Sequence, residues 1–485
     1  MGLLKRRKGV GSLFKYSATY AAGDLLEKAI GLAMLPAYVY FLAPADFGII
    51  ALVGTVTGLG GAVLSLGVYQ SIVRYYHNPP EAKDGQQIVG AAWLVLMIVP
   101  AAAIVALLTI GRPVLEFLLE GLSYGRYILV AMLITYCNVA FIETVLAVTR
   151  TRALVRRYVT VVLLRAILTA LFALAILVMV DQPSAFEVIL SQAVATLLCS
   201  MYSIRLLLSE ARLSSSAQLF GPLLRFGIPL MPLSSSQWAL RVQDRLILNR
   251  FVALSDIGAY AVGQRVASPM QILMAAGVRT LQPMMSQAAR GQDLSGLRSA
   301  VVRIYGVGTV ICLFGSLLAP TVSRALLPPA YGDSAELTAV LIPGLFAAAV
   351  FQLASSASVF YGGKTYRMTL LALIAAVMNG ALNLVLIPIH GIYGAALASL
   401  VTSVILAVAA WSTSPLPALL ENVRRSLFWT TASGALLLFG GAWLNASAFS
   451  GHIGGLLMSL AVLAALTVQA FVVNLTIKKA GHERD

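Results

Sequence analysis

The chain has 485 residues, of which 59% are apolar and only 11% are charged. Its mean hydropathy is +0.88, whereas soluble domains carry about a quarter charged residues, so the composition excludes an ordinary soluble fold. The formal net charge of +15 would suggest a nucleic-acid partner in a soluble protein. In a membrane protein, however, basic residues collect in the cytoplasmic loops, and we expect no nucleic-acid partner.

The apolar stretches predict an all-α integral membrane protein with about 14 spans, because a helix of about 20 apolar residues crosses a bilayer. In chain order the predicted spans are 16–42, 47–73, 88–109, 127–148, 158–180, 186–206, 222–249, 257–285, 301–322, 337–361, 367–388, 392–411, 426–444 and 453–475. An even number of spans returns the C-terminus to the side on which the chain begins.

The distribution of Lys and Arg predicts the orientation of these spans. Most cations fall in connections on the side of the N-terminus, and only Arg112, Arg126, Arg250 and Arg324 lie in connections on the other side. Since cytoplasmic loops are rich in Lys and Arg, we expect a multi-pass protein of the cell inner (plasma) membrane with both termini in the cytoplasm.

A weak internal repeat divides the predicted spans into two sets of six. At an offset of 210 residues, Asp46 aligns with Asp256 and Gly48 aligns with Gly258, each pair in the turn that precedes a span. Six spans are an even number, so the two copies share one orientation, as in transporters whose substrate path lies between two lobes. The predicted organisation is a six-helix lobe over 1–210, a second over 211–418, and two additional helices with a cytoplasmic tail over 419–485.

Two trios of charged residues repeat the spacing i, i+3, i+4 inside predicted spans, and each trio therefore lies along one helix face. They are Asp24, Glu27 and Lys28 in the first span and Arg241, Asp244 and Arg245 in the seventh. Ionisable residues at bilayer depth cost free energy and usually face a wet cavity or a partner. Two interpretations remain open: the stripes line a central cleft, or they form ion pairs within or between helices.

If the stripes line a cleft, their cations are candidate ligands for an anionic group, because Arg donates two hydrogen bonds to phosphate at once. We assign this role to Arg241, Arg245, Lys28 and Arg265. The acidic members are candidates for coupling transport to an H⁺ or Na⁺ gradient; they are Asp24, Glu27 and Asp244. Glu143 and Arg165 are weaker candidates in other spans.

The sequence carries no motif of an enzyme. It contains no phosphate-binding loop, no paired-His metal motif and no nucleophile elbow, and its three cysteines, Cys137, Cys199 and Cys312, lie apart within apolar stretches. We therefore predict a protein that is not an enzyme and holds neither a cofactor nor a metal site.

Several stretches, in this order, resemble the polysaccharide and O-antigen flippases of the multidrug/oligosaccharidyl-lipid/polysaccharide exporter superfamily. They are Leu42-Ala-Pro-Ala-Asp-Phe-Gly-Ile-Ile, Leu66-Gly67 with Arg74-Tyr-Tyr, Phe226-Gly-Ile-Pro-Leu-Met-Pro, Asp244-Arg245 with Asp256-Ile-Gly-Ala-Tyr, and Asn383 with Ile387-Pro388 and Gly391-Ile-Tyr-Gly-Ala-Ala. The resemblance covers nearly the whole chain.

This resemblance implies two six-helix bundles that face a central cavity with cationic residues such as Arg241 and Arg245. It also implies that the protein flips a polyprenyl-pyrophosphate-linked oligosaccharide from the cytoplasmic to the outer leaflet by alternating access. The products would be cell-surface polysaccharides such as O-antigen, lipopolysaccharide or exopolysaccharide. The expected partners are the lipid-linked oligosaccharide, membrane lipid and the polymerase and glycosyltransferase machinery.

Two other functions remain open at this stage. One is a cation-coupled exporter of small drugs from the same superfamily, which usually has 12 spans and acidic cavity residues. The other is a non-transporting scaffold of a polysaccharide-synthesis complex, whose charged stripes would tolerate neutralisation. A membrane-embedded polymerase is disfavoured because the predicted outer connections are short.

Overall fold

The computed structural model describes residues 10–77, 79, 84–111, 113, 124–212, 219–289, 294–362 and 365–416. These residues form helices joined by short connections, and no strand occurs among them. The all-α class predicted from the sequence is confirmed. The predicted spans 426–444 and 453–475 and the predicted segment 419–485 lie outside the described residues, so the number of 14 spans stays a prediction.

The chain divides into two compact units that are each discontinuous in sequence. Unit 1 comprises Met1–Ala37 and Leu52–Trp238, and unit 2 comprises Tyr38–Ala51 and Ala239–Asp485. A short early segment therefore packs with the later part of the chain, and the start of the second predicted repeat packs with the first.

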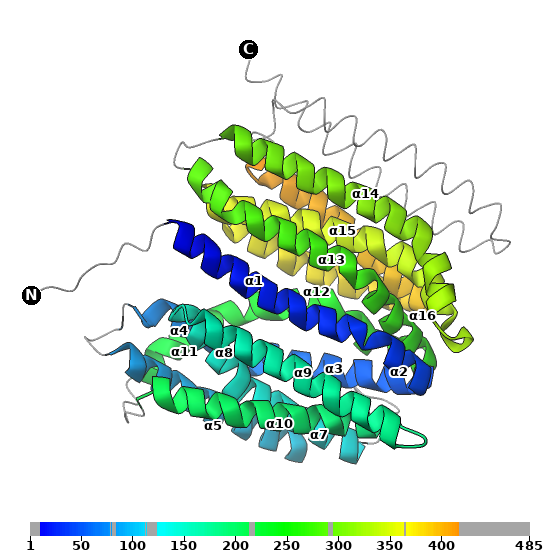
Figure 1. Cartoon of the computed structure of the whole chain (residues 1–485), viewed down its shortest axis with the longest axis horizontal. Coiled ribbons are helices and arrows are strands. Elements are labelled where there is room, and N and C mark those ends of the chain that lie inside the picture. The colour runs from blue at the N-terminus through cyan, green and yellow to red at the C-terminus, as the bar shows by residue number, and fades with distance from the viewer. Residues whose placement is uncertain are drawn as a thin grey trace, which may run out of the picture. The chain divides into compact units, whose positions relative to one another are not determined.

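The helices of the first predicted repeat are drawn from blue to green in Figure 1. In chain order they are α1 (Val10–Ala33), α2 (Leu35–Phe41), α3 (Pro44–Leu64), α4 (Val68–Tyr75), α5 (Gly85–Thr109), α7 (Tyr124–Cys137), the π-helical turn η2 (Asn138–Ile142), α8 (Glu143–Thr151), α9 (Val155–Met179) and α10 (Ala185–Glu210). Within unit 1, α9 packs against both α1 and α10, and α10 packs against α7.

The helices of the second repeat follow from green to orange in Figure 1. They are α11 (Phe220–Gly227), the 3-10 turn η4 (Ile228–Leu230), α12 (Met231–Leu248), α13 (Leu254–Ala288), α14 (Leu294–Leu326), the 3-10 turn η5 (Pro329–Tyr331), α15 (Asp333–Ala357), the π-helical turn η6 (Ser358–Gly362) and α16 (Thr365–Thr413). Within unit 2, α15 packs against α13, α14 and α16.

Local sequence signals explain where several helices begin and bend. Asp84 and Ser184 each cap a helix in a capping box, with Gln87 and Glu187 respectively as the reciprocal partner, which satisfies backbone N–H groups that have no partner within the helix. At Gly391 in α16 the backbone adopts φ 56° and ψ −132°, a region that suits only glycine. This break separates the predicted spans 367–388 and 392–411.

Each of the twelve predicted spans up to residue 411 falls on described helix. Within the described part of the chain, eight helices are long and apolar enough to cross a membrane, and α16, which holds two predicted spans, is one of them. The remaining three predicted spans correspond to α1–α2, α11–α12 and α13, which carry the charged stripes and Arg265. The protein is thus a multi-pass membrane protein.

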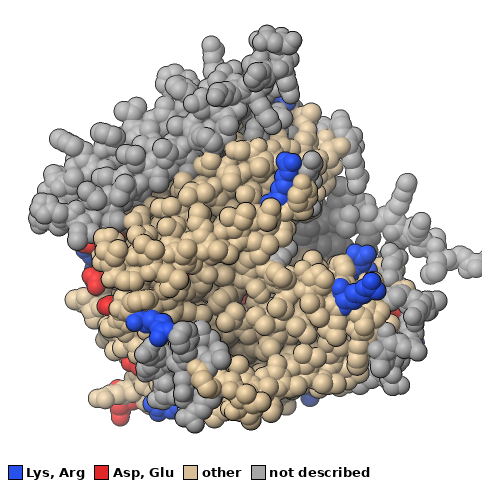
Figure 2. Space-filling model, turned by 180° about the vertical axis from the view of Figure 1, so that it is seen from behind, with Lys and Arg blue, Asp and Glu red and all other residues tan. Residues whose placement is uncertain are grey.

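The outward surface is apolar, as contact with lipid requires. Large side chains such as Val178 and Met179 of α9 and Val377 and Ile389 of α16 are more than half exposed. On the face drawn in Figure 2 the described surface is mostly uncharged, and its Lys and Arg side chains lie in a few separate groups. In water, apolar patches of this extent would drive association.

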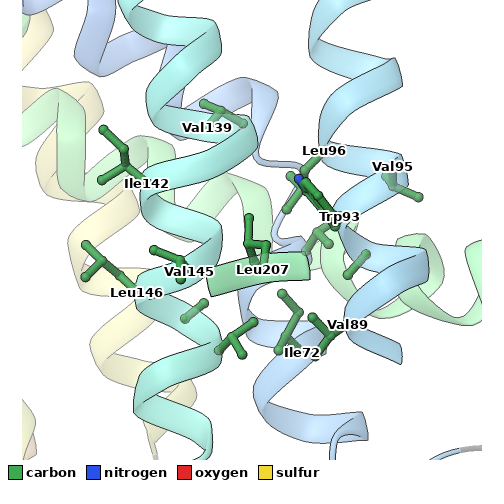
Figure 3. Close-up of a cluster of buried hydrophobic side chains, with 14 of the residues drawn as sticks. Ile72, Val89, Trp93, Val95, Leu96, Val139, Ile142, Val145, Leu146 and Leu207 are labelled. Carbon is green, nitrogen blue, oxygen red and sulfur yellow. The ribbon is translucent and has the colours of Figure 1, made fainter. Parts of the chain in front are cut away.

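The core of unit 1 is a contiguous cluster of buried apolar side chains. Ile72 of α4, Val89 and Trp93 of α5, Val145 of α8 and Leu207 of α10 all belong to it, and Figure 3 shows them converging from these helices. This core fixes the positions of α8 and α10, and α9 packs directly against both. It therefore also sets the position of the charged residues that α9 presents.

Candidate functional site

The first charged stripe pairs with a neighbouring helix inside unit 1. The Arg165 guanidinium on α9 forms an ion pair with Glu27 of α1 and a second one with Glu143 of α8, in which Nη1 lies 3.3 Å from Oε1. A single cation therefore bridges two carboxylates from two other helices. The cluster carries one more acidic than basic group.

Asp24 lies one turn earlier on α1 and contacts the same helix α9. The Tyr158 hydroxyl donates a hydrogen bond of 2.7 Å to Asp24 Oδ1. The Tyr158 ring packs edge-on against Tyr20, with centroids 4.9 Å apart, and the Arg150 guanidinium lies 5.0 Å from its centroid. These contacts fix the face of α1 that bears the carboxylates.

Lys28, the cationic member of this trio, is exposed and forms no ion pair with any described residue. The two carboxylates of the trio contact α9, whereas Lys28 has no ion-pair partner in the part of the chain that the structure describes.

The second stripe, in unit 2, forms a buried polar network around Asp244 of α12. The Asp244 side chain accepts hydrogen bonds from the Tyr260 hydroxyl and from Gln264 Nε2 at 3.1 Å, both on α13, and from the backbone N–H of Arg245 at 2.9 Å. Asp244 is only 3% exposed. A buried carboxylate with several donors is held in one orientation.

Gln264 also links Asp244 to its neighbour, because its Oε1 accepts a hydrogen bond from Arg245 Nη2. The Arg245 Nε atom is buried and has no hydrogen-bond partner among the described residues. Arg241, one turn earlier on α12, is exposed and pairs with no described residue. Arg245 is therefore partly engaged in the network, whereas Arg241 makes no contact with it.

Arg265 has a different environment from the other candidate cations. Its guanidinium lies 5.0 Å from the ring centroid of Phe47 and 5.7 Å from that of Tyr38. Cation–π contacts of this kind hold a cation without an acidic partner. Arg265 is therefore engaged by two aromatic rings of the 38–51 segment.

A second, uncharged network joins α12 to α16. Gln243 Nε2 donates to Asn379 Oδ1 at 2.8 Å and to the Ala376 carbonyl at 3.0 Å, and Asn383 Nδ2 donates to the same Asn379 oxygen at 3.0 Å. Asn379 in turn donates to Thr402 Oγ1 at 3.3 Å. These hydrogen bonds fix α12 against α16, while Asn383 Oδ1 is buried and has no hydrogen-bond partner among the described residues.

The structure thus brings the predicted residues together within each unit and adds partners that the sequence did not indicate. Asp244 and Arg245 share one network, and Asp24 and Glu27 both face α9, which carries Tyr158 and Arg165. The tyrosines and Gln264 were not predicted as site residues, and no local pattern marks them. Glu143 and Arg165, by contrast, are isolated opposite charges in apolar spans. The sequence alone could therefore have predicted an ion pair between them.

Comparison with known proteins places this arrangement in a known fold. The structure aligns with "Lipid II flippase MurJ, inward closed conformation" at a TM-score of 0.68 and 13% identity, covering 93% of this chain and 97% of that chain. It aligns with "MATE multidrug transporter DinF-BH in complex with R6G" at 0.58 and 16%, covering 83% and 94%, and with "MATE in complex with MaD3S" at 0.55 and 13%, covering 87% and 96%.

No curated protein sequence matches the chain. The profile of the family described as polysaccharide biosynthesis protein, in contrast, matches residues 39–334. This match covers more than half of the chain and includes both α12 and α13, which carry the polar network around Asp244. The chain therefore belongs to the polysaccharide biosynthesis protein family.

Proposed function

We propose that the protein is a flippase that moves a polyprenyl-pyrophosphate-linked oligosaccharide from the cytoplasmic to the outer leaflet by alternating access. Sugars and a diphosphate cannot cross about 30 Å of hydrocarbon unaided. A polyprenyl tail can stay in lipid while the protein carries only the head group. The polymer made from it would be a cell-surface polysaccharide such as O-antigen, lipopolysaccharide or exopolysaccharide.

The observation that carries this proposal is the pair of arginines on α12 within a chain of the polysaccharide biosynthesis family. Among the described residues, Arg241 is exposed and forms no ion pair, and the Nε atom of Arg245 has no hydrogen-bond partner. The Asp244 carboxylate accepts its hydrogen bonds from Tyr260, Gln264 and the Arg245 backbone N–H. It therefore does not occupy the guanidinium groups of the two arginines. Arg241 and Arg245 would hold the diphosphate, and Arg265 in the same unit would add to the positive potential. Lys28 is a further candidate ligand for the diphosphate.

Asp24, Glu27 and Asp244 are the proposed groups for coupling to an H⁺ or Na⁺ gradient. Each is a carboxylate within a helix that bears a charged stripe, and each already has hydroxyl or Arg partners whose hydrogen bonds would change on protonation or ion binding. The protein would work in the inner membrane with both termini cytoplasmic, beside polymerase and glycosyltransferase enzymes.

The test is the leaflet distribution of lipid-linked oligosaccharide in cells depleted of the protein. Wild type should restore the outer-leaflet pool, and Arg241→Ala/Arg245→Ala should leave the substrate on the cytoplasmic side. Arg156→Ala/Arg205→Ala is the matched control, because it removes two exposed cations from α9 and α10 and should rescue as wild type does. Equal rescue by both double variants would refute the cationic site.

A drug exporter of the same superfamily is the second candidate function. The acidic excess of the Glu27–Arg165–Glu143 cluster favours it, because acidic groups attract cationic drugs. Drug accumulation in the depleted cells, with an unchanged leaflet distribution of lipid-linked oligosaccharide, would support this function instead. If neither quantity changes, a scaffold function is favoured.

A further inference from the structure

Within unit 2, the backbones of α3 and α13 touch at a pair of glycines. A methyl group on Gly48 would overlap the Leu254 carbonyl oxygen, and one on Gly258 would overlap the Pro44 carbonyl oxygen. The contact is therefore reciprocal: each glycine admits the backbone of the other helix. These are also the two glycines that the internal repeat aligns at an offset of 210 residues.

Three side chains reinforce this backbone contact. The Arg265 guanidinium lies 5.0 Å from the Phe47 ring centroid, and the Tyr331 hydroxyl donates a hydrogen bond of 2.9 Å to the Leu42 carbonyl. Phe47 and Tyr331 are each only 1% exposed. We call the set Leu42, Phe47, Gly48, Gly258, Arg265 and Tyr331 the 48/258 latch.

Unit 1 holds a second contact built from the same parts. A methyl group on Gly67 would overlap the Gly227 carbonyl oxygen, and one on Gly227 would lie 2.5 Å from the Leu66 carbonyl oxygen. The Arg74 guanidinium lies 4.4 Å from the Phe226 ring centroid, and Ser71 Oγ donates a hydrogen bond of 2.8 Å to the Leu223 carbonyl. We call the set Gly67, Ser71, Arg74, Leu223, Phe226 and Gly227 the 67/227 latch.

The two latches share their chemistry and their place in the repeat. Each combines a glycine backbone contact, an Arg over a Phe ring and a hydroxyl donating to a carbonyl. Each also joins a segment of the first predicted repeat to a segment of the second. Gly48 lies near the start of α3, and Gly67 lies just beyond its end. Because α3 is apolar and long enough to cross the membrane, its two ends are expected at opposite membrane faces.

We propose that the two latches are the gates of the transport cycle, the 48/258 latch at the outer face and the 67/227 latch at the cytoplasmic face, and that they open alternately. This inference rests on the alternating access of the proposed function but not on the identity of the substrate. A glycine contact suits a gate because the two helices meet through their backbones there. They can separate and return without repacking of side chains at the point of contact. One cation–π contact and one hydrogen bond add a modest and reversible attraction.

The test measures how one latch responds when the other is weakened. The three native cysteines are replaced by Ala, and a single reporter, Leu42→Cys or Leu223→Cys, is introduced. Both leucines are buried and each carbonyl accepts the hydroxyl of its latch. A membrane-impermeant maleimide is applied to right-side-out vesicles for Leu42→Cys and to inverted vesicles for Leu223→Cys.

Weakening the outer latch by Phe47→Leu should increase labelling of Leu42→Cys by roughly fivefold, as expected from the loss of one cation–π contact, and should decrease labelling of Leu223→Cys. Phe226→Leu should produce the opposite pair of changes. The milder variants Tyr331→Phe and Ser71→Ala should act in the same directions, which guards against loss of folding in the Phe variants.

Phe186→Leu is the matched control, because Arg126 lies 5.0 Å from the Phe186 ring centroid and both residues belong to the first repeat. It should change neither reporter. Increased labelling at both faces, or a change confined to the weakened latch, would overturn the gate assignment. Labelling needs no substrate, so a wrong assignment of the substrate would leave this result intact and would appear only in the leaflet assay.

Discussion

Substitution of Gly258 by Ala should destabilise the protein, although Ala normally favours a helix. The new methyl group overlaps the Pro44 carbonyl oxygen, and neither atom can rotate away because both are fixed to backbone. Overpacking of this kind costs about 1–3 kcal/mol, and the higher helix propensity of Ala returns up to about 1 kcal/mol. With the full propensity gain, the expected net loss of unfolding free energy is therefore up to about 2 kcal/mol.

The matched control is Gly61→Ala in α3, where the added methyl group would meet no described atom within 4 Å beyond its chain neighbours and the adjacent backbone of α3. This variant should gain up to about 1 kcal/mol, since only helix propensity changes. Thermal unfolding of the detergent-purified protein measures both variants against wild type. Equal thermal stability of Gly258→Ala and Gly61→Ala would refute the backbone contact.

Because Gly48 and Gly258 share one contact, the effects of their substitution should not be additive. Once one methyl group has separated α3 from α13, the second meets less resistance, so Gly48→Ala/Gly258→Ala should lose less stability than the sum of the single variants. A double-mutant cycle measures this coupling, which typically amounts to about 0.5–3 kcal/mol for residues in contact. Strict additivity would show that the two glycines do not share one contact.

Three other substitutions test the polar clusters and the break in α16. Arg165→Met should cost about 1–3 kcal/mol, since it leaves Glu27 and a second carboxylate without their cation, and Arg165→Lys should recover part of this loss in the same thermal assay. Tyr260→Phe should cost about 1 kcal/mol by removing a donor to Asp244, and unchanged stability would argue against that hydrogen bond. Gly391→Ala should cost about 1–3 kcal/mol through backbone strain, and an unaltered melting curve would exclude the bend.

The sequence predicts the spans well because a single physical requirement, about 20 apolar residues per crossing, governs them. Even the break near Gly391 was anticipated as a boundary between two spans. The π-helical turn at Asn138–Ile142 was not anticipated, since it lies inside an uninterrupted apolar stretch. A change from α-helix to π-helix at this point does not alter the hydropathy profile.

The partners of the charged residues were harder to predict than their positions. Helical spacing places Asp24 and Glu27 on one face, but it does not say which helix that face meets. Arg165, 138 residues away from Glu27, becomes its partner only through the packing of α1 on α9. The same applies to Tyr260 and Asp244, because hydroxyl donors are too common in membrane helices to stand out in a single sequence.

The exchange of segments between the two units has a consequence for biosynthesis. The Ser71 hydroxyl donates to the carbonyl of Leu223, which lies 152 residues later in the chain. The Leu42 carbonyl accepts from the hydroxyl of Tyr331, which lies 289 residues later. At about 5–20 residues translated per second, the ribosome needs roughly 10–30 s to supply the first partner and up to about a minute to supply the second. During that delay the nascent first half is in the membrane without the 220–238 segment that completes its own unit. The first half expressed alone should therefore be degraded in the cell, and co-expression of the second half as a separate polypeptide should rescue it.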